Sequence, residues 1–490
     1  MPAASPRLSA HDSVFLDWER PEQPMHVAEC MVYDGTFTAA DMVRMIRERI
    51  HLLPRYRQRI VPAPLGLARP TWEDDPDFDV AAHVDELTLP AGDDRTLSRV
   101  GGELYCRLID RSRPPWHLTV LHGYRLGTVV FLKLHHAMVD GVSSVELIEV
   151  LHTTEPDVPP PPAPAEPWQP RPVPGVLGRL GDVVADQLDT GLAAARELVD
   201  VIRPGAVPAL AARAAALARA AVDTVPLALR RLPATPFNAP IHADRDFAWV
   251  ELPIAEVGRV RKALGGTVND LVLTVLAGAM ARYMRRHGHP TDGRQLQALC
   301  PVSVRTTDQS GAFGNRISMV VAPLEIGIAD GAARLAAQRT AMRERKARGQ
   351  AQGIHEVIAV TDYCPAPLYR LIWKLWPRGW FPLHVTSTNV PGPRQPLYLG
   401  GHELLRWYPF GVQWTNNALF LCTLSYREHL ILGPVTDPRI VDVWEFAADL
   451  RAAYDEVRDA ADRRGPPPPT DRPTDRPTDR PAPPPPADRR

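Results

Sequence analysis

The chain has 490 residues, of which 45% are hydrophobic and 23% are charged, and its formal net charge is −1. This balance lacks the clustered positive charge of nucleic-acid-binding proteins, so we expect no nucleic-acid partner. The five scattered cysteines show no CxxC spacing, which argues against a disulfide framework or a zinc site and favours a reducing, cytoplasmic setting.

The composition changes along the chain and suggests four regions. Residues 1–153 alternate apolar strand-like and helix-like segments and form an N-terminal lobe. Residues 154–234 hold a proline-rich linker followed by helices rich in Ala, Leu and Arg, which connect to a C-terminal lobe at 235–463. The tail, 464–490, contains proline runs and TDRP repeats, and we expect it to be disordered.

The second lobe contains one strongly periodic helix, because apolar residues recur at helical spacing between Val268 and Met280. Strand-like runs follow at 317–325, 383–389, 418–426 and 429–433. Strands mixed with helices in both lobes predict an α/β (α+β) protein. A cleft between two lobes is a common place for a ligand site.

Two adjacent histidines close an apolar run in VFLKLHHAMVDG, residues 130–141. Residues 128–135 are typical of a buried strand, and helical spacing resumes after Asp140. His136 therefore lies in a strand-to-helix loop, where catalytic groups are often found. If the strand geometry persists that far, the His136 side chain ends an apolar row and can remain uncharged, as a general base must.

Other interpretations of this motif remain open. Asp140 has the residue type of a helix N-cap, and either histidine fits an ordinary core or loop position. No third ligand lies at a recognisable spacing, so we expect no metal site. Spacing alone does not decide between packing and chemistry.

HHAMVDG at 135–141 resembles the HHxxxDG motif of CoA-dependent acyltransferases and peptide-synthetase condensation domains. The chain as a whole resembles the bacterial wax ester synthase/acyl-CoA:diacylglycerol acyltransferase family, in order from about residue 8 to 455. The segments that carry this likeness are LSAHDSVFLDWERPEQPMHV at 8–27, LPRYRQRIV at 53–61, PTWEDDPDFDVAAHV at 70–84, DRSRPPW at 110–116, TPFNAPI at 235–241, TVNDLVL at 267–273, PVSVR at 301–305, GN at 314–315 and TNVPGP at 388–393.

The resemblance implies a two-lobe fold with mixed sheets and a central channel between the lobes. It places His135, His136 and Asp140 in the catalytic motif, with His136 as the general base. Asp140 is then expected to pair with Arg305 and to tie the two halves together. Acyl-CoA would be the substrate, and no cofactor is implied.

Three further residues accompany this prediction as support for the site. Gly141 would let the backbone turn close to the substrate or into the helix. Asn269 and Asp270 match the family's ND motif, but Thr267 and Asp270 also have the spacing of a capping box that opens the helix. Capping and a role near the channel are both open for this pair.

Contact with a membrane surface is a further expectation from the sequence. Residues 368–383, LYRLIWKLWPRGWFPL, place three tryptophans among three basic residues, as in interfacial segments, and the helices at 176–234 are a second candidate. Packing on the core is the alternative for both. We expect no secretory signal and no membrane-spanning helix.

We therefore predict an O-acyltransferase that acylates diacylglycerol or a long-chain alcohol from acyl-CoA. The expected location is the cytoplasm, or the surface of the inner membrane or of lipid droplets. Two alternatives are an acyltransferase for complex cell-envelope lipids and a catalytically silent lipid-binding or droplet protein on the same fold.

Overall fold

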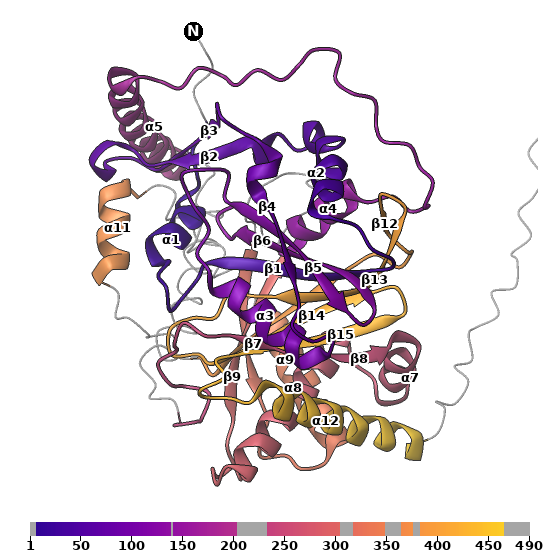
Figure 1. Ribbon diagram of the computed structural model, residues 1–490. Coiled ribbons are helices and arrows are strands. Elements are labelled where there is room, and N and C mark those ends of the chain that lie inside the picture. The colour runs from indigo at the N-terminus through magenta and orange to yellow at the C-terminus, as the bar shows by residue number, and fades with distance from the viewer. Residues whose placement is uncertain are drawn as a thin grey trace, which may run out of the picture.

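The computed structural model describes residues 6–138, 141–202, 233–303, 317–347, 364–375 and 383–464. Strands and helices alternate in both halves of the chain and build two large sheets with helices packed on them (Figure 1). The predicted mixed α/β class is confirmed. The predicted tail, most of 203–234 and part of the 368–383 segment lie outside the described residues.

The first sheet has six strands in the order β12-β13-β1-β6-β5-β4. All of its neighbours are antiparallel except β4 and β5. Its strands are β1 (His26–Tyr33), β4 (Val84–Thr88), β5 (Trp116–Tyr124), β6 (Gly127–His135), β12 (Tyr398–Leu399) and β13 (His402–Phe410).

The second sheet has seven strands in the order β10-β9-β11-β14-β15-β7, and β8 also pairs with β15. Here β11 is parallel to both of its neighbours. The strands are β7 (Asp246–Phe247), β8 (Val250–Pro253), β9 (Leu296–Ser303), β10 (Ile317–Leu324), β11 (Val385–Pro391), β14 (Leu419–Tyr426) and β15 (His429–Thr436). The four strands predicted after residue 316 are confirmed to within a few residues.

The remaining elements cover the sheets or link them. A two-stranded sheet is formed by β2 (Gln58–Val61) and β3 (Thr71–Asp74). The α-helices are α1 (Ala10–Trp18), α2 (Ala39–Arg47), α3 (Asp94–Cys106), α4 (Gly141–Leu151), α5 (Val176–Ile202), α7 (Ile254–Leu264), α8 (Val268–Arg286), α9 (Gly331–Ala347), α11 (Ala366–Leu375) and α12 (Val443–Arg464). Short 3₁₀ helices are η1 (Ile50–Leu52), η2 (Pro54–Arg57), η3 (Pro64–Gly66) and η4 (Val80–His83).

Strand β13 joins the two halves of the chain. It follows β11 of the second sheet in sequence but pairs with β1 of the first sheet, from Ala28↔Phe410 to Tyr33↔Leu404. A division of the chain into lobes at residues 1–153 and 235–463 does not predict that a strand of the second lobe pairs with the first sheet. This pairing ties residues near the C-terminus to the strand that borders β6.

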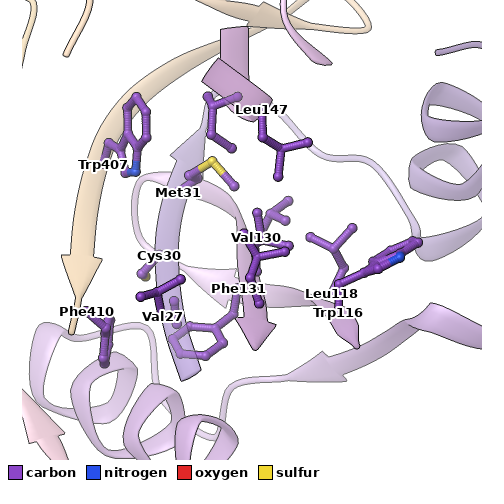
Figure 2. Packing of buried hydrophobic residues seen from close by; sticks show 14 of the residues in the cluster. Val27, Cys30, Met31, Trp116, Leu118, Val130, Phe131, Leu147, Trp407 and Phe410 are labelled. Carbon is purple, nitrogen blue, oxygen red and sulfur yellow. The ribbon is translucent and has the colours of Figure 1, made fainter. Parts of the chain in front are cut away.

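A shared apolar core fixes the sheets. Phe131 from β6 and Phe410 from β13 meet edge to face, with ring centroids 5.2 Å apart, and Phe247 from β7 packs on Phe410 at 4.2 Å. Figure 2 shows Phe131 and Phe410 with Val27, Cys30 and Trp407 in this cluster. Buried aromatic rings of this size contribute strongly to stability, so their packing holds strand β6 in a fixed position.

Local sequence explains where the second-lobe helix begins. The Thr267 hydroxyl accepts from Asp270 N at 3.1 Å, and the Asp270 carboxylate accepts from Thr267 N at 2.8 Å. This reciprocal pair is the predicted capping box, and helix α8 runs from Val268 as expected. Within the described residues no single helix is long and apolar enough to cross a membrane, and α7 and α8 meet such criteria only together, across a bend of 92°.

Candidate active site

The histidine pair lies where β6 ends. His135 is the last residue of the strand and pairs with His26 of β1, while His136 begins the following turn. The His135 side chain is fully buried, and its Nδ1 accepts from Ala137 N at 3.1 Å. Because Nδ1 is an acceptor, the proton of a neutral His135 lies on Nε2. The first histidine is thus part of the framework of the turn.

His136 is held by its backbone and by its ring. Its N–H donates to Met25 O at 2.7 Å, and its imidazole stacks on the phenyl ring of Phe15, with centroids 4.2 Å apart and planes 16° from parallel. The residue is half-buried, whereas His135 is buried. Of the two rings, His136 therefore has the accessibility that a general base needs.

Helix α1 supplies Phe15. Its N-cap, Ser9, accepts from Asp12 N at 3.0 Å, and the buried Phe15 lies one turn before the helix ends. Glu19 follows α1 as its C-cap and donates its N–H to Phe15 O at 3.2 Å. Since Phe15 and Glu19 are four residues apart, both point to the same side of this segment.

Glu19 contacts both strand-end histidines. Its Oε1 lies 3.0 Å from His26 Nε2 and 3.4 Å from His135 Nε2, and its Oε2 lies 3.6 Å from Arg111 Nε. Its side chain is 4% exposed. This is a buried carboxylate that holds two imidazoles from neighbouring strands, directly beside the backbone that carries His136.

Glu19 is charged and His26 is uncharged at neutral pH, because both pKa values are lowered. Burial alone would raise the pKa of Glu19, but hydrogen bonds from His135 and His26 leave that pKa well below its ordinary range, so the carboxylate is ionised. Burial lowers the pKa of His26 to about 4, against the opposing effect of Glu19. At neutral pH an uncharged His26 therefore faces an ionised Glu19.

The other predicted site residues are distributed differently. Asp140 and Arg305 lie outside the described residues, so their pairing stays a prediction. Gly141 is the first residue of α4. Asp270 is buried and serves the capping box of α8, and Asn269 is half-buried in the first turn of that helix. A role for these two residues near a channel stays a prediction.

The TNVPGP segment is more regular than its proline content suggests. Residues 388–391 continue β11, parallel to β14. Gly392 N then donates to Ser425 Oγ at 3.1 Å, and a Cβ at this glycine would overlap Ser425 O. Only a glycine fits so close to the neighbouring strand.

Three residues of the site were missed in the sequence: Phe15, Glu19 and His26. All lie in the opening segment 8–27, which carries part of the resemblance to the family. The spacing of Phe15 and Glu19 on one helix face is a signal that could have paired them. The contact to His26 could not be found this way, because it depends on the register of β1 with β6. Among the described residues, no group of three or more His, Cys, Asp or Glu side chains could hold a metal ion.

Family models match most of the chain. Residues 8–272 match the wax ester synthase/diacylglycerol acyltransferase catalytic domain, and residues 313–458 match the C-terminal domain of the same family. A Mycobacterium tuberculosis protein named as a diacylglycerol O-acyltransferase is 32% identical over 433 residues, which cover 85% of this chain and 88% of that protein. A second such protein of that organism, tgs1, is 27% identical over 433 residues, or 86% of this chain and 88% of its own.

Solved structures show the same fold. The wax ester synthase/diacylglycerol acyltransferase from Marinobacter aquaeolei VT8 superposes with a TM-score of 0.65 at 24% identity, covering 93% of this chain and all of that one. The starter condensation domain of rhizomide synthetase, in complex with C8-CoA and Leu-SNAC, gives a TM-score of 0.58 at 16% identity, with 94% of each chain covered. The two-lobe architecture expected from the motif is thereby confirmed.

Proposed function

Because this chain belongs to the wax ester synthase/diacylglycerol acyltransferase family, we propose that it transfers a fatty acyl group from acyl-CoA to diacylglycerol or to a long-chain alcohol, with His136 as the general base. The products are triacylglycerol or a wax ester, together with free CoA. The chain is an acyltransferase. That its acceptor is diacylglycerol or a long-chain alcohol is what we propose.

The proposed step needs one imidazole and no covalent intermediate. His136 takes the proton from the acceptor hydroxyl as that oxygen attacks the thioester carbonyl. The tetrahedral intermediate then expels the CoA thiolate, which receives the proton from the imidazolium. A thioester is already activated, so no cofactor is required. A positioned base typically contributes about 10²–10⁴-fold to such a rate.

One observation supports His136 over its neighbour. The His135 side chain is fully buried, its Nδ1 accepts a backbone N–H, and its Nε2 lies 3.4 Å from Glu19 Oε1. His136 is half-buried in the turn after β6, where its backbone N–H and the face of its ring hold it against Met25 and Phe15. This difference is what a fixed general base beside a structural histidine requires.

The acceptors in this proposal are water-insoluble, so the enzyme must reach them at a lipid surface. We therefore propose a cytoplasmic protein that works peripherally on a membrane or on a lipid droplet. Two other functions compete with this proposal: acylation of complex cell-envelope lipids and catalytically silent lipid binding.

Product analysis separates these functions. Purified protein is incubated with radiolabelled palmitoyl-CoA and either hexadecanol or diolein, and the lipids are resolved by thin-layer chromatography. Labelled wax ester or triacylglycerol supports the proposal and identifies the acceptor. Label that appears only with cell-envelope lipid acceptors favours the first alternative, and no labelled ester with any acceptor favours the silent lipid-binding protein.

A further inference from the structure

Helix α5 exposes a row of large apolar side chains, although Val183 and Asp186 of the same helix are buried. A surface helix normally buries its apolar face and exposes its polar one. In α5 the large apolar side chains at the solvent-facing positions are exposed, Leu177 to 85% and Leu188 to 60%. The residues of this outer face, which we call the α5 stripe, are Leu177, Leu180, Val184, Leu188 and Leu192.

Three polar residues of α5, Arg179, Asp186 and Gln187, contact the first lobe. The buried Asp186 carboxylate lies 3.4 Å from Arg7 Nε and 3.5 Å from Arg69 Nη2. Arg179 pairs with Glu73 at 3.2 Å, and Gln187 donates to Leu67 O at 2.7 Å. Ion pairs and hydrogen bonds therefore fix the helix to the first lobe and determine which face is presented outward.

The spacing of the α5 stripe makes it continuous. Its members recur every three or four residues, so they form one row along the helix. The positions beside them on the same face are Gly181, Ala185 and Gly191, all exposed and none charged. From Leu177 to Leu192 this uncharged row is about 24 Å long. No exposed charge interrupts it, and Asp189 lies at its border.

Two neighbouring segments extend the apolar surface. Leu65, in η3 against α5, is 91% exposed. A Cβ on the adjacent Gly66 would overlap the guanidinium of Arg370, so α11 lies directly against this loop. Leu368 and Leu371 of α11 are each 50% exposed. Figure 1 shows α5 and α11 along the same edge of the molecule.

We propose that the α5 stripe, together with Leu65, Leu368 and Leu371, is the surface by which the protein lies on a lipid layer, with α5 parallel to the plane of that layer. This inference rests on the proposed function, because a lipid acceptor requires contact with a lipid phase. A helix that presents an uncharged apolar row outward and anchors its polar row inward has the geometry of an interfacial helix. An exposed apolar patch of this extent marks an interaction site.

The charges around the surface indicate which lipids it prefers. Arg370 pairs with Asp17 at 2.9 Å, and Asp189, at the border of the stripe, lies 3.8 Å from Arg7 Nη1. On α11 the exposed Lys374 follows Leu371 by one turn and adds a positive charge to this surface. With a single such charge beside the apolar stripe, binding is driven mainly by apolar burial, and we expect a modest preference for anionic over neutral vesicles and a weak dependence on salt.

Flotation tests this surface in the full-length protein. Phosphatidylcholine vesicles are mixed with wild type, with Leu180→Gln/Leu188→Gln, and with Leu52→Gln/Leu87→Gln, whose leucines are exposed elsewhere in the first lobe. We expect wild type and the Leu52/Leu87 control to float with the vesicles. The stripe variant should lose roughly tenfold in vesicle affinity for each leucine replaced. All of the replaced side chains are exposed, so folding should be kept, and circular dichroism checks this.

The readout is independent of turnover. His136→Ala should float like wild type, so failure of the acyltransferase proposal and failure of this surface are distinguishable. The proposal is overturned if wild type stays in the bottom fraction or if the stripe variant floats as well as wild type. It is likewise overturned if light scattering shows a wild-type dimer that becomes a monomer in the stripe variant while neither floats, since the stripe would then bind a second copy.

Discussion

The imidazole of His136 and the phenyl ring of Phe15 lie face to face, with 4.2 Å between centroids and 16° between planes. The two residues come from the turn after β6 and from helix α1, which are 121 positions apart in the chain. Phe15 is buried and His136 is half-buried. The aromatic ring therefore limits how the imidazole can rotate, and helix α1 becomes part of the active site.

Removal of this stack should slow catalysis more than it weakens binding. Phe15→Leu keeps an apolar side chain but loses the flat surface, and such ring pairs contribute about 0.5–1.5 kcal/mol. We expect kcat to fall up to about tenfold while KM changes little, because the base is less well oriented. Phe78→Leu, which removes a ring packed near Trp116, is the control and should leave kcat unchanged. Equal kcat in wild type and Phe15→Leu would contradict a positioning role.

Glu19 should be needed to position the histidine turn. Glu19→Gln removes the charge that faces His26 and His135 but keeps the shape of the side chain. We expect the free energy of unfolding to fall by about 1–3 kcal/mol in urea titration at pH 7.5, since charge-assisted hydrogen bonds are lost. The exposed Glu22→Gln is the matched control. A Glu19→Gln protein with wild-type stability and wild-type kcat would show that this carboxylate has no such role.

Stability should fall with pH in a defined window. Burial lowers the pKa values of His26, His152 and His384 to about 4 each. Between pH 6.5 and 4 the unfolded chain binds protons at these positions and the folded chain does not, so stability is lost as pH falls. Each histidine contributes up to about 3 kcal/mol to this loss. Calorimetry of wild type and His152→Gln should show a flatter decline in the variant, and parallel declines would contradict this assignment.

Contact between the lobes should depend on Gly102 of α3. A Cβ at this position would overlap Arg245 O, in the segment that leads into β7 of the second sheet. Gly102→Ala should therefore destabilise the protein by about 1–3 kcal/mol. Gly258 lies in the interior of α7 with open space around it, and Gly258→Ala should be neutral or stabilise by up to about 1 kcal/mol. Thermal melting of both variants checks the contrast, and two similar shifts would refute it.

Much of the fold could be predicted because its signals are local. Apolar runs predicted β6, β14 and β15, and the Thr267–Asp270 spacing predicted the start of α8. The transfer of β13 into the first sheet could not be predicted, because pairing between Ala28 and Phe410 leaves no local mark in either segment.

The candidate site could likewise be predicted only in part. The motif identified His135 and His136, and their position at the end of a strand followed from the apolar run before them. Their contacts with Phe15, Glu19 and His26 come from α1 and β1, more than 100 residues earlier. Only the folded chain brings these residues together. The outward position of the apolar row of α5 could not be predicted from periodicity either, since an amphipathic pattern does not say which face points outward.

The most direct test of the account is the turnover of His136→Ala with palmitoyl-CoA and the acceptor that wild type prefers, measured as released CoA thiol at pH 7.5. A general base of this kind should be worth at least about 10²-fold, so we predict a loss of that size in kcat with an unchanged melting temperature. A folded His136→Ala protein that retains more than half of the wild-type kcat would contradict the account.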